Sequence, residues 1–305
     1  MAETVPFSEC DALLDWMALT EALEDGHRLP RASIEDSMMF RDSDTLLSRC
    51  AWIDGLGIAV KSATIFPGNA RAGVPTVNGG VNLYSDSDGV LEAVLDFHLV
   101  TKWKTAGDSL LAARKLARRD AKYILIVGAG TVARSLWQAY GALYPDARFS
   151  VWSRTTTSAE ALAEDCSGVN VIRELEPAVR AADIITCATM ANEPLIHGTW
   201  LQPGQHIDLI GAYRPDMREA DDEALRRARI FVDSRETTLD HIGELKTPIK
   251  AGVITKKSII ADYYDLASGN FTRTSDDEIT LFKNGGGAHL DLMTSRYILQ
   301  AWRAR

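Results

Sequence analysis

The stretch that most constrains this chain runs from Tyr123 to Val127 and is followed at once by Gly128-Ala-Gly130. An unbroken apolar run of this length is typical of a strand buried on both faces of a parallel sheet. The helix expected next, over about 132–140, would direct its free N–H groups over the glycine turn, where a diphosphate binds well. A second strand is predicted at 148–152, and Ala133 is small where helix and strand meet. The segment is therefore predicted to be a βαβ unit of the dinucleotide-binding type.

The end of the second strand indicates which dinucleotide is preferred. It reads Val151-Trp-Ser-Arg-Thr155 and lacks the acidic residue that accepts hydrogen bonds from an unphosphorylated ribose. Arg154 would attract a 2′-phosphate, and Ser153 and Thr155 can donate hydrogen bonds to it, so the sequence favours NADPH over NADH. Thr189 and Met190 are two further candidates, because they follow a later strand at the carboxyl edge of the sheet, where the nicotinamide lies in such folds. The candidate cofactor-binding residues are Gly128, Gly130, Thr131, Val132, Ala133, Ser153, Arg154, Thr155, Thr189 and Met190.

Composition and charge restrict the class of protein. The 305 residues are 46% hydrophobic and 25% charged, with a formal net charge of -9. This balance argues against nucleic acid as the main partner, and no block rich in Lys or Arg contradicts it. No apolar stretch reaches the ~18 residues of a membrane span. The N-terminus lacks the pattern of a signal peptide, so a cytoplasmic protein is expected. The cysteines and histidines show no metal-ligand spacing, and no metal site is predicted.

Hydrophobic periodicity divides the chain into two kinds of structure. After a helix expected over 8–29, the first third reads as strands joined by hairpins and is mostly antiparallel. These strands are expected at 33–40, 45–52, 57–66, 76–84 and 90–95. Beyond a helix over 101–119, strands and helices alternate, which is typical of a doubly wound parallel sheet. Further strands are expected at 171–172, 184–187, 206–210 and 230–233, with helices at 158–165, 222–229 and 287–305.

Several motifs outside the glycine turn occur in a fixed order. They are Gly57-Ile-Ala-Val-Lys61, Phe66-Pro-Gly-Asn69, Thr101-Lys-Trp-Lys-Thr-Ala106, Gly211-Ala-Tyr-Arg-Pro-Asp-Met-Arg-Glu219 and Thr280-Leu-Phe-Lys-Asn284. In their order and spacing, the chain resembles the ornithine cyclodeaminase/mu-crystallin family over essentially its whole length. The resemblance implies a Rossmann domain at 113–286, inserted between segments 1–112 and 287–305. Those segments would form an α+β domain that binds the substrate and makes the contact of a homodimer. It also implies chemistry at an imine flanked by a carboxylate.

The resemblance gives roles to individual residues. Lys61 matches the family's active-site lysine, and a lysine in an apolar strand is costly to bury unless it is paired or functional. It would protonate or hydrogen-bond the imine nitrogen as hydride reaches the carbon. Lys104 stands where many members have an arginine for the substrate carboxylate. Arg31 is the expected second carboxylate partner, and Asn69 is a further candidate for binding the substrate.

One departure from the family pattern bears on the activity. Cyclodeaminases of the family have an aspartate where this chain has Tyr213, and Asp216 lies too far along the chain to replace it. The resemblance therefore favours an NADPH-dependent reductase of cyclic ketimine carboxylates, which converts Δ1-pyrroline-2-carboxylate or Δ1-piperideine-2-carboxylate to L-proline or L-pipecolate. The alternatives are an ornithine cyclodeaminase, an acyclic imino-acid reductase of the alanine dehydrogenase or iminosuccinate reductase type, and a non-catalytic NADPH-binding protein. A dicarboxylate substrate would need another cation, for which Arg49 and Arg71 are candidates.

Overall fold

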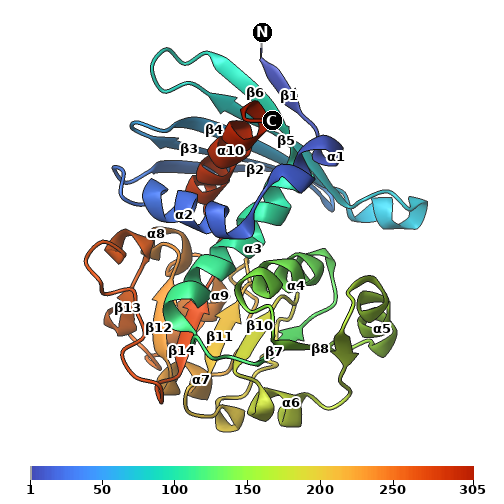
Figure 1. Cartoon of the computed structure of the whole chain (residues 1–305), viewed down its shortest axis with the longest axis vertical. Helices are drawn as coiled ribbons and strands as arrows, with labels where there is room; N and C mark the ends of the chain where they lie inside the picture. The colour runs from blue at the N-terminus through green and yellow to red at the C-terminus, as the bar shows by residue number, and fades with distance from the viewer. Residues whose placement is uncertain (1) are drawn as a thin grey trace. The chain divides into compact units, whose positions relative to one another are not determined.

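The chain divides into two compact units, which are described separately (Figure 1). The computed structural model describes residues 2–305, except for the side chains of residues 70 and 71, so the candidate Arg71 lies outside the described side chains. Unit 1 comprises 1–104 and 286–305, and unit 2 comprises 105–285. The first boundary between the units lies between residues 104 and 105, inside helix α3 (Phe97–Leu116), whereas the sequence analysis predicted it between 112 and 113. The second boundary lies between residues 285 and 286, whereas it was predicted between 286 and 287.

Unit 1 is built on a six-stranded sheet in the order β1-β6-β5-β4-β3-β2. Neighbouring strands are antiparallel except β1 and β6, which are parallel. The mostly antiparallel start expected from the hairpin pattern is confirmed, but β1 has only 3 residues and is too short to give a periodic signal. The strands are β1 (Glu3–Val5), β2 (Ser33–Arg41), β3 (Asp44–Ile53), β4 (Gly57–Ile65), β5 (Val77–Tyr84) and β6 (Leu91–Asp96).

The single helix expected over 8–29 is wrong. The chain instead forms α1 (Phe7–Cys10), the 3-10 helix η1 (Asp11–Leu13) and α2 (Trp16–Gly26). The last break comes at Asp15, which is extended and whose carboxylate accepts a hydrogen bond from Ala18 N at 2.8 Å. An aspartate in this position begins a new helix because it satisfies one of the N–H groups that the first turn leaves without a helical partner.

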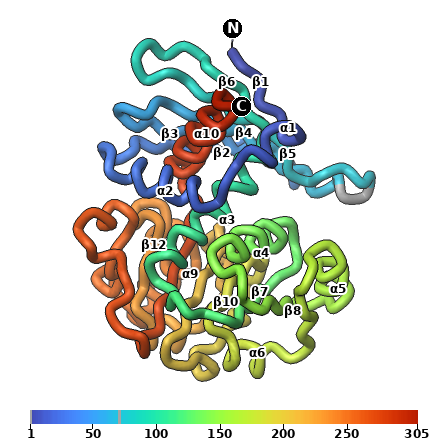
Figure 2. The backbone as a smooth tube through the Cα atoms, viewed as in Figure 1, coloured from blue at the N-terminus to red at the C-terminus, as the bar shows by residue number. Residues whose placement is uncertain are grey.

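Helix α10 (Ala288–Arg303) lies against the unit 1 sheet at β3 and β4 and beside α2 (Figure 1). Gly26 of α2 permits this close packing, because a Cβ atom there would lie 2.6 Å from the sulfur of Met293. Near the end of α10, Arg303 Nε donates to Glu3 Oε1 at 2.7 Å, so the first and last segments of the chain lie side by side (Figure 2). The 3-10 helix η2 (Pro67–Ala72) connects β4 to β5.

Unit 2 contains an eight-stranded parallel sheet in the order β13-β12-β14-β11-β10-β7-β8-β9. All residues of β7 after its first are buried, as an apolar strand covered on both faces requires. The expected doubly wound α/β fold is confirmed, although β13 and β14 were not predicted as strands. The strands are β7 (Tyr123–Val127), β8 (Arg148–Trp152), β9 (Val169–Val171), β10 (Ile184–Cys187), β11 (His206–Leu209), β12 (Arg229–Val232), β13 (Ile259–Ala261) and β14 (Thr280–Lys283).

Short helices connect these strands. Three were expected from the sequence, and α6, α8 and α9 were not. The α-helices after α3 are α4 (Thr131–Leu143), α5 (Thr156–Asp165), α6 (Leu175–Ala181), α7 (Asp222–Arg227), α8 (Arg235–Thr238) and α9 (Gly243–Lys250). The 3-10 helices are η3 (Gly198–Trp200), η4 (Lys256–Ser258) and η5 (Tyr263–Asp265). In the part of the chain that the structure describes, no helix combines the length and apolar character needed to cross a membrane.

Candidate active site

The glycine turn of unit 2 follows the carboxyl end of β7. Gly128 has φ +110, and a Cβ atom there would lie 2.5 Å from the carbonyl oxygen of Ala188, so only glycine fits. Gly130 is the N-cap residue of α4 and makes no side-chain cap. A Cβ atom built on Gly130 would meet no atom within 4 Å, so the space over the turn is open. An open helix N-terminus above a glycine turn suits the phosphates of a dinucleotide.

A cavity of about 770 Å³ lies at this turn and extends along the carboxyl ends of β7, β8 and β10. Six of the predicted cofactor-binding residues line it, namely Gly128, Gly130, Ser153, Arg154, Thr189 and Met190. Eight other lining residues were not predicted as cofactor-binding, and those with polar atoms in the side chain are Trp152, Ser158, Asn192 and Glu193. Glycines, hydroxyls and an arginine at the carboxyl edge of a parallel sheet are the donor set that a pyridine dinucleotide requires. The residues present therefore fit such a cofactor.

Four other predicted cofactor residues are not among the described residues that line this cavity. Thr131, Val132 and Ala133 form the first turn of α4, and Ala133 is completely buried. Ala133 thus occupies the contact of helix with strand that was expected to need a small side chain. Thr155 is the N-cap residue of α5.

A buried glutamate holds the carboxyl ends of β10 and β11 together. One carboxylate oxygen of Glu219 accepts hydrogen bonds from the Thr189 N–H at 2.7 Å and the Thr189 hydroxyl at 2.8 Å. The other accepts from Gly211 N at 2.6 Å. Behind it, Glu244 accepts from the backbone N–H of Glu219 at 2.7 Å, and burial with the nearby charge of Glu219 raises the pKa of Glu244 to about 7. These bonds fix the loop in which Thr189 lines the cavity.

In unit 1, Lys61 lies on β4 with its side chain on the buried face of the sheet. Its neighbours on that face are Ala59 and Ala63, whose small side chains leave room for a long one. Lys61 is only 6% exposed. Its ammonium group donates to Asp291 Oδ1 at 2.8 Å and to Thr101 Oγ1 at 2.9 Å. The lysine is therefore paired and buried, rather than a strand-edge lysine facing water.

Helix α3 presents one face to this lysine. Phe97, Thr101 and Lys104 recur at the spacing that places side chains on the same side of a helix. The Lys61 ammonium lies 4.8 Å from the centre of the Phe97 ring. Lys104 is 7% exposed, and its ammonium donates to the carbonyl oxygen of Gly286 at 3.2 Å. Thus two lysines, on a strand and on a helix, have their charged ends held by the start of α10 and the glycines before it.

A third cation, Arg49, lies directly opposite Lys61 on the neighbouring strand β3. Like charges in that position are destabilising by themselves. Asp291 compensates them, because its carboxylate is 2.8 Å from the Lys61 nitrogen and 3.9 Å from Arg49 Nη1. Arg49 also pairs with Asp36 at 2.6 Å and donates to the carbonyl oxygen of Gly286 at 2.8 Å. The arrangement leaves an excess of positive charge around one buried carboxylate.

The pKa values follow from this geometry. Burial lowers the pKa of Lys61 to about 8, because the loss of water outweighs the attraction of Asp291. The positive charges of Lys104 and Arg49 lower it further. Burial alone would raise the pKa of Asp291, but the three cations and the Lys61 hydrogen bond hold it below its ordinary value. The pair is therefore ammonium and carboxylate at neutral pH, and Lys61 can give up its proton near pH 8.

The other two substrate candidates lie in different surroundings. Arg31 is exposed, and its charge acts on two buried histidines of unit 1. Burial, and to a smaller extent Arg31, lower the pKa of His27 to about 4, and burial keeps the pKa of His289 well below its usual value. Lys104 and Arg49 act on His289 as well, so Arg31 belongs to the same electropositive region. Asn69 instead donates to the carbonyl oxygen of Pro75 at 3.1 Å, within its own loop.

The model of the ornithine cyclodeaminase/mu-crystallin family matches residues 38–305. The chain belongs to this family. The Δ1-pyrroline-2-carboxylate reductase of Paracoccus denitrificans is 51% identical over 298 residues, which cover 96% of this chain and 94% of the relative. The resemblance identified from the ordered motifs is thereby confirmed.

Two solved structures of similar proteins extend the comparison. The Thermococcus litoralis Δ1-pyrroline-2-carboxylate reductase, in complex with NADH and L-proline, is 26% identical with a TM-score of 0.91 and matches 99% of this chain and 98% of its own. An archaeal alanine dehydrogenase dimer with bound NAD is 25% identical with a TM-score of 0.90 and matches 99% of this chain and 96% of its own. The fold of both units is therefore shared along nearly the whole chain.

The family's cyclodeaminase position is occupied here by an exposed tyrosine. Tyr213 is 57% exposed in the loop after β11. The nearby Asp216 is bound by Arg214 at 2.9 Å, and this hydrogen bond holds the pKa of the Asp216 carboxyl below its usual range. A carboxylate engaged in this way is a poor base for removing a proton. Asp216 therefore does not replace the missing aspartate.

Sequence reasoning missed two acidic residues that organise this family member's site. Asp291 pairs with Lys61 from a position 230 residues away in the sequence, and Glu219 braces the loop of Thr189. The signal for Asp291 was an acidic residue between Leu290 and Leu292 in a predicted helix, and in the structure every residue from Ala288 to Ser295 is buried. A carboxylate in such a position requires a cation, and Lys61 is the buried cation of the facing strand.

Proposed function

We propose that this protein is an NADPH-dependent reductase of cyclic ketimine carboxylates, with Δ1-pyrroline-2-carboxylate as substrate and L-proline as product. The observation that carries the proposal is the buried Lys61, held by Asp291 and Thr101 with a pKa of about 8. A group with this pKa delivers a proton efficiently near neutral pH. The reductase of Paracoccus denitrificans at 51% identity, and the related structure that holds NADH and L-proline, support the same reaction.

The proposed mechanism consists of a hydride transfer and a proton transfer. Gly128, Gly130 and Thr189 would hold the cofactor, and a bound nicotinamide supplies the hydride that reduces the imine carbon. The Lys61 ammonium donates its proton to the imine nitrogen, which becomes the ring N–H of the product. The resulting Lys61 amine regains a proton from solvent. Lys104 binds the substrate carboxylate, whose negative charge the electropositive region of unit 1 favours.

The preference for NADPH depends on the end of β8. Ser153 and Arg154 line the glycine-turn cavity, and Arg154 is exposed there. A guanidinium group binds a phosphate through parallel hydrogen bonds, whereas an acidic residue would repel it. The related structures contain NADH and NAD, so dependence on NAD(P)H is the common property. Arg154 is the reason for proposing the phosphorylated form here.

Initial rates with a panel of substrates test this function. We expect oxidation of NADPH with Δ1-pyrroline-2-carboxylate, a slower reaction with Δ1-piperideine-2-carboxylate, and little with pyruvate plus ammonia, the reaction of an alanine dehydrogenase. L-Ornithine with catalytic NAD should yield no proline. A faster rate with pyruvate and ammonia would favour the acyclic alternative. NADPH binding without turnover of any imine would favour a binding protein.

We also propose that the chain forms a homodimer through the edge strand β2. An edge strand presents unpaired backbone groups, and exposed apolar side chains on it mark a protein contact. Met39 is 62% exposed and Phe40 is 72% exposed on this strand. Light scattering after size-exclusion chromatography should give twice the chain mass, and Phe40→Lys should give monomer. Val90→Lys, at an exposed position outside β2, is the control, and a monomeric wild type would contradict the proposal.

A further inference from the structure

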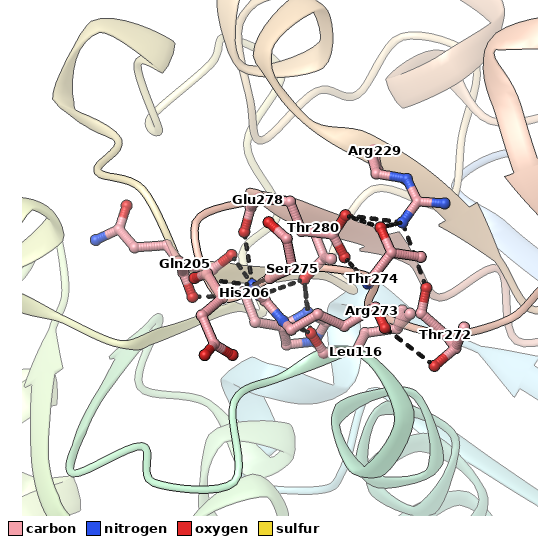
Figure 3. A network of polar contacts seen from close by, with 12 residues as sticks. Leu116, Gln205, His206, Arg229, Thr272, Arg273, Thr274, Ser275, Glu278 and Thr280 are labelled. Atoms are coloured by element: carbon pink, nitrogen blue, oxygen red, sulfur yellow. Dashed lines mark hydrogen bonds and ion pairs between the residues drawn. The ribbon is translucent and has the colours of Figure 1, made fainter.

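Unit 2 has a second cavity, of about 700 Å³, that the reductase reaction does not use. It is lined by residues from 114 to 120, which are the last turn of α3 and the segment after it, and by the loop 272–276. These segments lead into the first residues of β7 and β14, respectively. The cavity therefore lies at the amino edge of the parallel sheet, whereas the glycine turn follows the carboxyl end of β7. Figure 3 shows the loop and the polar contacts that hold it.

The lining of this amino-edge cavity is strongly basic. Its charged residues are Arg114, Lys115, Arg118, Arg119 and Arg273, against the carboxylates Asp120 and Asp276. Four of the six residues at 114–119 are basic, a block that the sequence reasoning overlooked. The concentration is notable because the whole chain has a formal net charge of -9. A concave basic site on an acidic protein attracts small anions selectively.

Arg273 forms a fixed cationic wall of the cavity. Its guanidinium donates to the carbonyl oxygens of Leu116 at 2.6 Å, Glu278 at 2.6 Å and Gln205 at 3.2 Å (Figure 3). It also donates to the hydroxyl of Thr280 at 3.1 Å. All of these acceptors are neutral, so they hold the group in place without cancelling its charge. Burial lowers the pKa of Arg273, and although the charges of Glu278 and Asp276 oppose this, the charge of Arg118 lowers it further. A bound anion would stabilise the two guanidinium groups together.

The loop across from α3 is held rigidly as well. The Glu278 carboxylate accepts hydrogen bonds from the Thr274 N–H at 2.5 Å and the Thr274 hydroxyl at 2.8 Å. Arg229 donates to the same carboxylate at 2.8 Å (Figure 3). Glu278 is thereby paired with a residue outside the cavity lining, and the carboxylates that line the cavity are Asp120 and Asp276. The site is preformed, and its five cationic side chains outnumber its two carboxylates, although Arg118 also pairs with Asp183 at 2.6 Å.

We propose that the amino-edge cavity binds a small polyanion that carries two or more phosphate or carboxylate groups. A volume of about 700 Å³ exceeds what one inorganic phosphate fills and suits a metabolite-sized ligand. Arginines at several points of the wall favour a ligand whose charges are spread over separate groups. The proposal does not depend on the reductase activity, because no residue of the cavity belongs to the Lys61 cluster or the glycine turn.

Calorimetric titration of the full-length protein tests the site, with inorganic pyrophosphate and citrate as separate probes at ionic strength of about 0.15 M. Loss of two charged contacts in Lys115→Gln/Arg119→Gln should weaken binding by about tenfold to a hundredfold. Binding of pyrophosphate alone, citrate alone or both would assign the anionic group that the site takes. Arg180→Gln, an exposed arginine paired with Glu176 on α6, is the matched control and should bind like the wild type.

Arg154→Gln separates this cavity from the glycine turn. If Arg154→Gln loses the probe and Lys115→Gln/Arg119→Gln keeps it, the anion occupies the glycine-turn cavity and the proposal is overturned. Equal binding by all variants, or no binding by the wild type, overturns it too. Circular dichroism checks folding, and Arg119→Gln alone, at an exposed position, serves if the double variant unfolds. NADPH binding, followed by its fluorescence, reports on the proposed function independently.

Discussion

The Lys61 cluster of unit 1 and the glycine-turn cavity of unit 2 place their positive charges in opposite ways. In unit 1, Lys61 and Lys104 are 6% and 7% exposed, and their ammonium groups are already bound by Asp291 and by the Gly286 carbonyl. In unit 2, Arg154 is exposed at the edge of an open cavity. Buried, paired charges are fixed before a ligand arrives and have altered pKa values, whereas an exposed charge recognises its ligand in water. Substitutions in unit 1 should therefore change turnover and pH dependence, and those in unit 2 should change cofactor choice.

The largest effect is expected at Lys61. Lys61→Met removes the proton donor but fills similar space, so kcat should fall by about a hundredfold to ten thousandfold. The Kd for NADPH, measured by fluorescence, should stay within about twofold because Lys61 is not among the residues that line the glycine-turn cavity. Lys102→Met is the matched control, since this neighbouring lysine pairs with Asp11 at 2.8 Å outside the cluster. If Lys61→Met kept a wild-type kcat, the proposed proton donor would be wrong.

Asp291→Asn should give the next largest effect, through the pKa of Lys61. The wild-type kcat/KM should decline as pH rises through about 8, where Lys61 loses its proton. Asp291 raises the pKa of Lys61. The Asp291→Asn variant should therefore lose kcat/KM at a lower pH than the wild type, and its rate at pH 8 should be lower by about tenfold or more. The dependence of kcat/KM on pH, measured from about pH 6 to about pH 10, covers roughly two pH units on each side of that pKa and detects the shift. An unchanged profile would show that Asp291 does not control Lys61.

The same pair makes a prediction for stability. The folded-state pKa of Lys61 is depressed from 10.5 to about 8, so between these values the unfolded chain binds more protons than the folded one. The contribution of Lys61 to the free energy of unfolding therefore rises with pH across this window. In Asp291→Asn the unpaired ammonium is more costly, and the loss of Tm should be greatest at low pH. Thermal denaturation at several pH values measures this trend, and a loss that grew with pH would contradict it.

A smaller effect is expected at Lys104. Lys104→Gln removes one charge from the proposed carboxylate site, so KM for the imine should rise by about tenfold with a smaller change in kcat. Lys102→Gln, two residues earlier on the same helix and therefore on a different face, should leave KM unchanged. Steady-state kinetics with saturating NADPH separates the two parameters. A fall in kcat without a rise in KM would indicate that Lys104 acts on the reaction rather than on binding of the carboxylate.

Local sequence patterns explain which parts of the fold were predictable. The β7 strand, the glycine turn and α4 are encoded within about twenty consecutive residues, and Lys61 stands out as a charge in an apolar strand. Asp291 could not be assigned to Lys61, because 230 residues separate them and only folding brings α10 onto β4. The break at Asp15 was missed for a different reason. The helical spacing of apolar residues in segment 8–29 continued through the break, whereas the Asp15 side chain favoured capping a new helix.

The amino-edge cavity illustrates the same limit. The basic residues at 114–119 lie at the end of the helix predicted over 101–119, which is observed as Phe97–Leu116, so Arg118 and Arg119 follow it. A charge run on a predicted helix is ordinarily a solvated face. Only the return of the loop 272–276 beside the end of α3 makes them a concave site. Arg273 shows the dependence most clearly. Its guanidinium reaches the carbonyls of Leu116 and Gln205, which no local pattern connects to it.

The smallest effect should come from Arg154, and it most directly tests the contrast between the units. Arg154→Gln removes the charge expected to bind a 2′-phosphate, so kcat/KM for NADPH should fall by about tenfold. The value for NADH, which lacks that phosphate, should change by less than about twofold because an exposed side chain contributes little to anything else. The pH profile set by Lys61 should remain in place. A parallel loss with both cofactors would mean that Arg154 supports the cavity as a whole and that NADPH is not preferred through this residue.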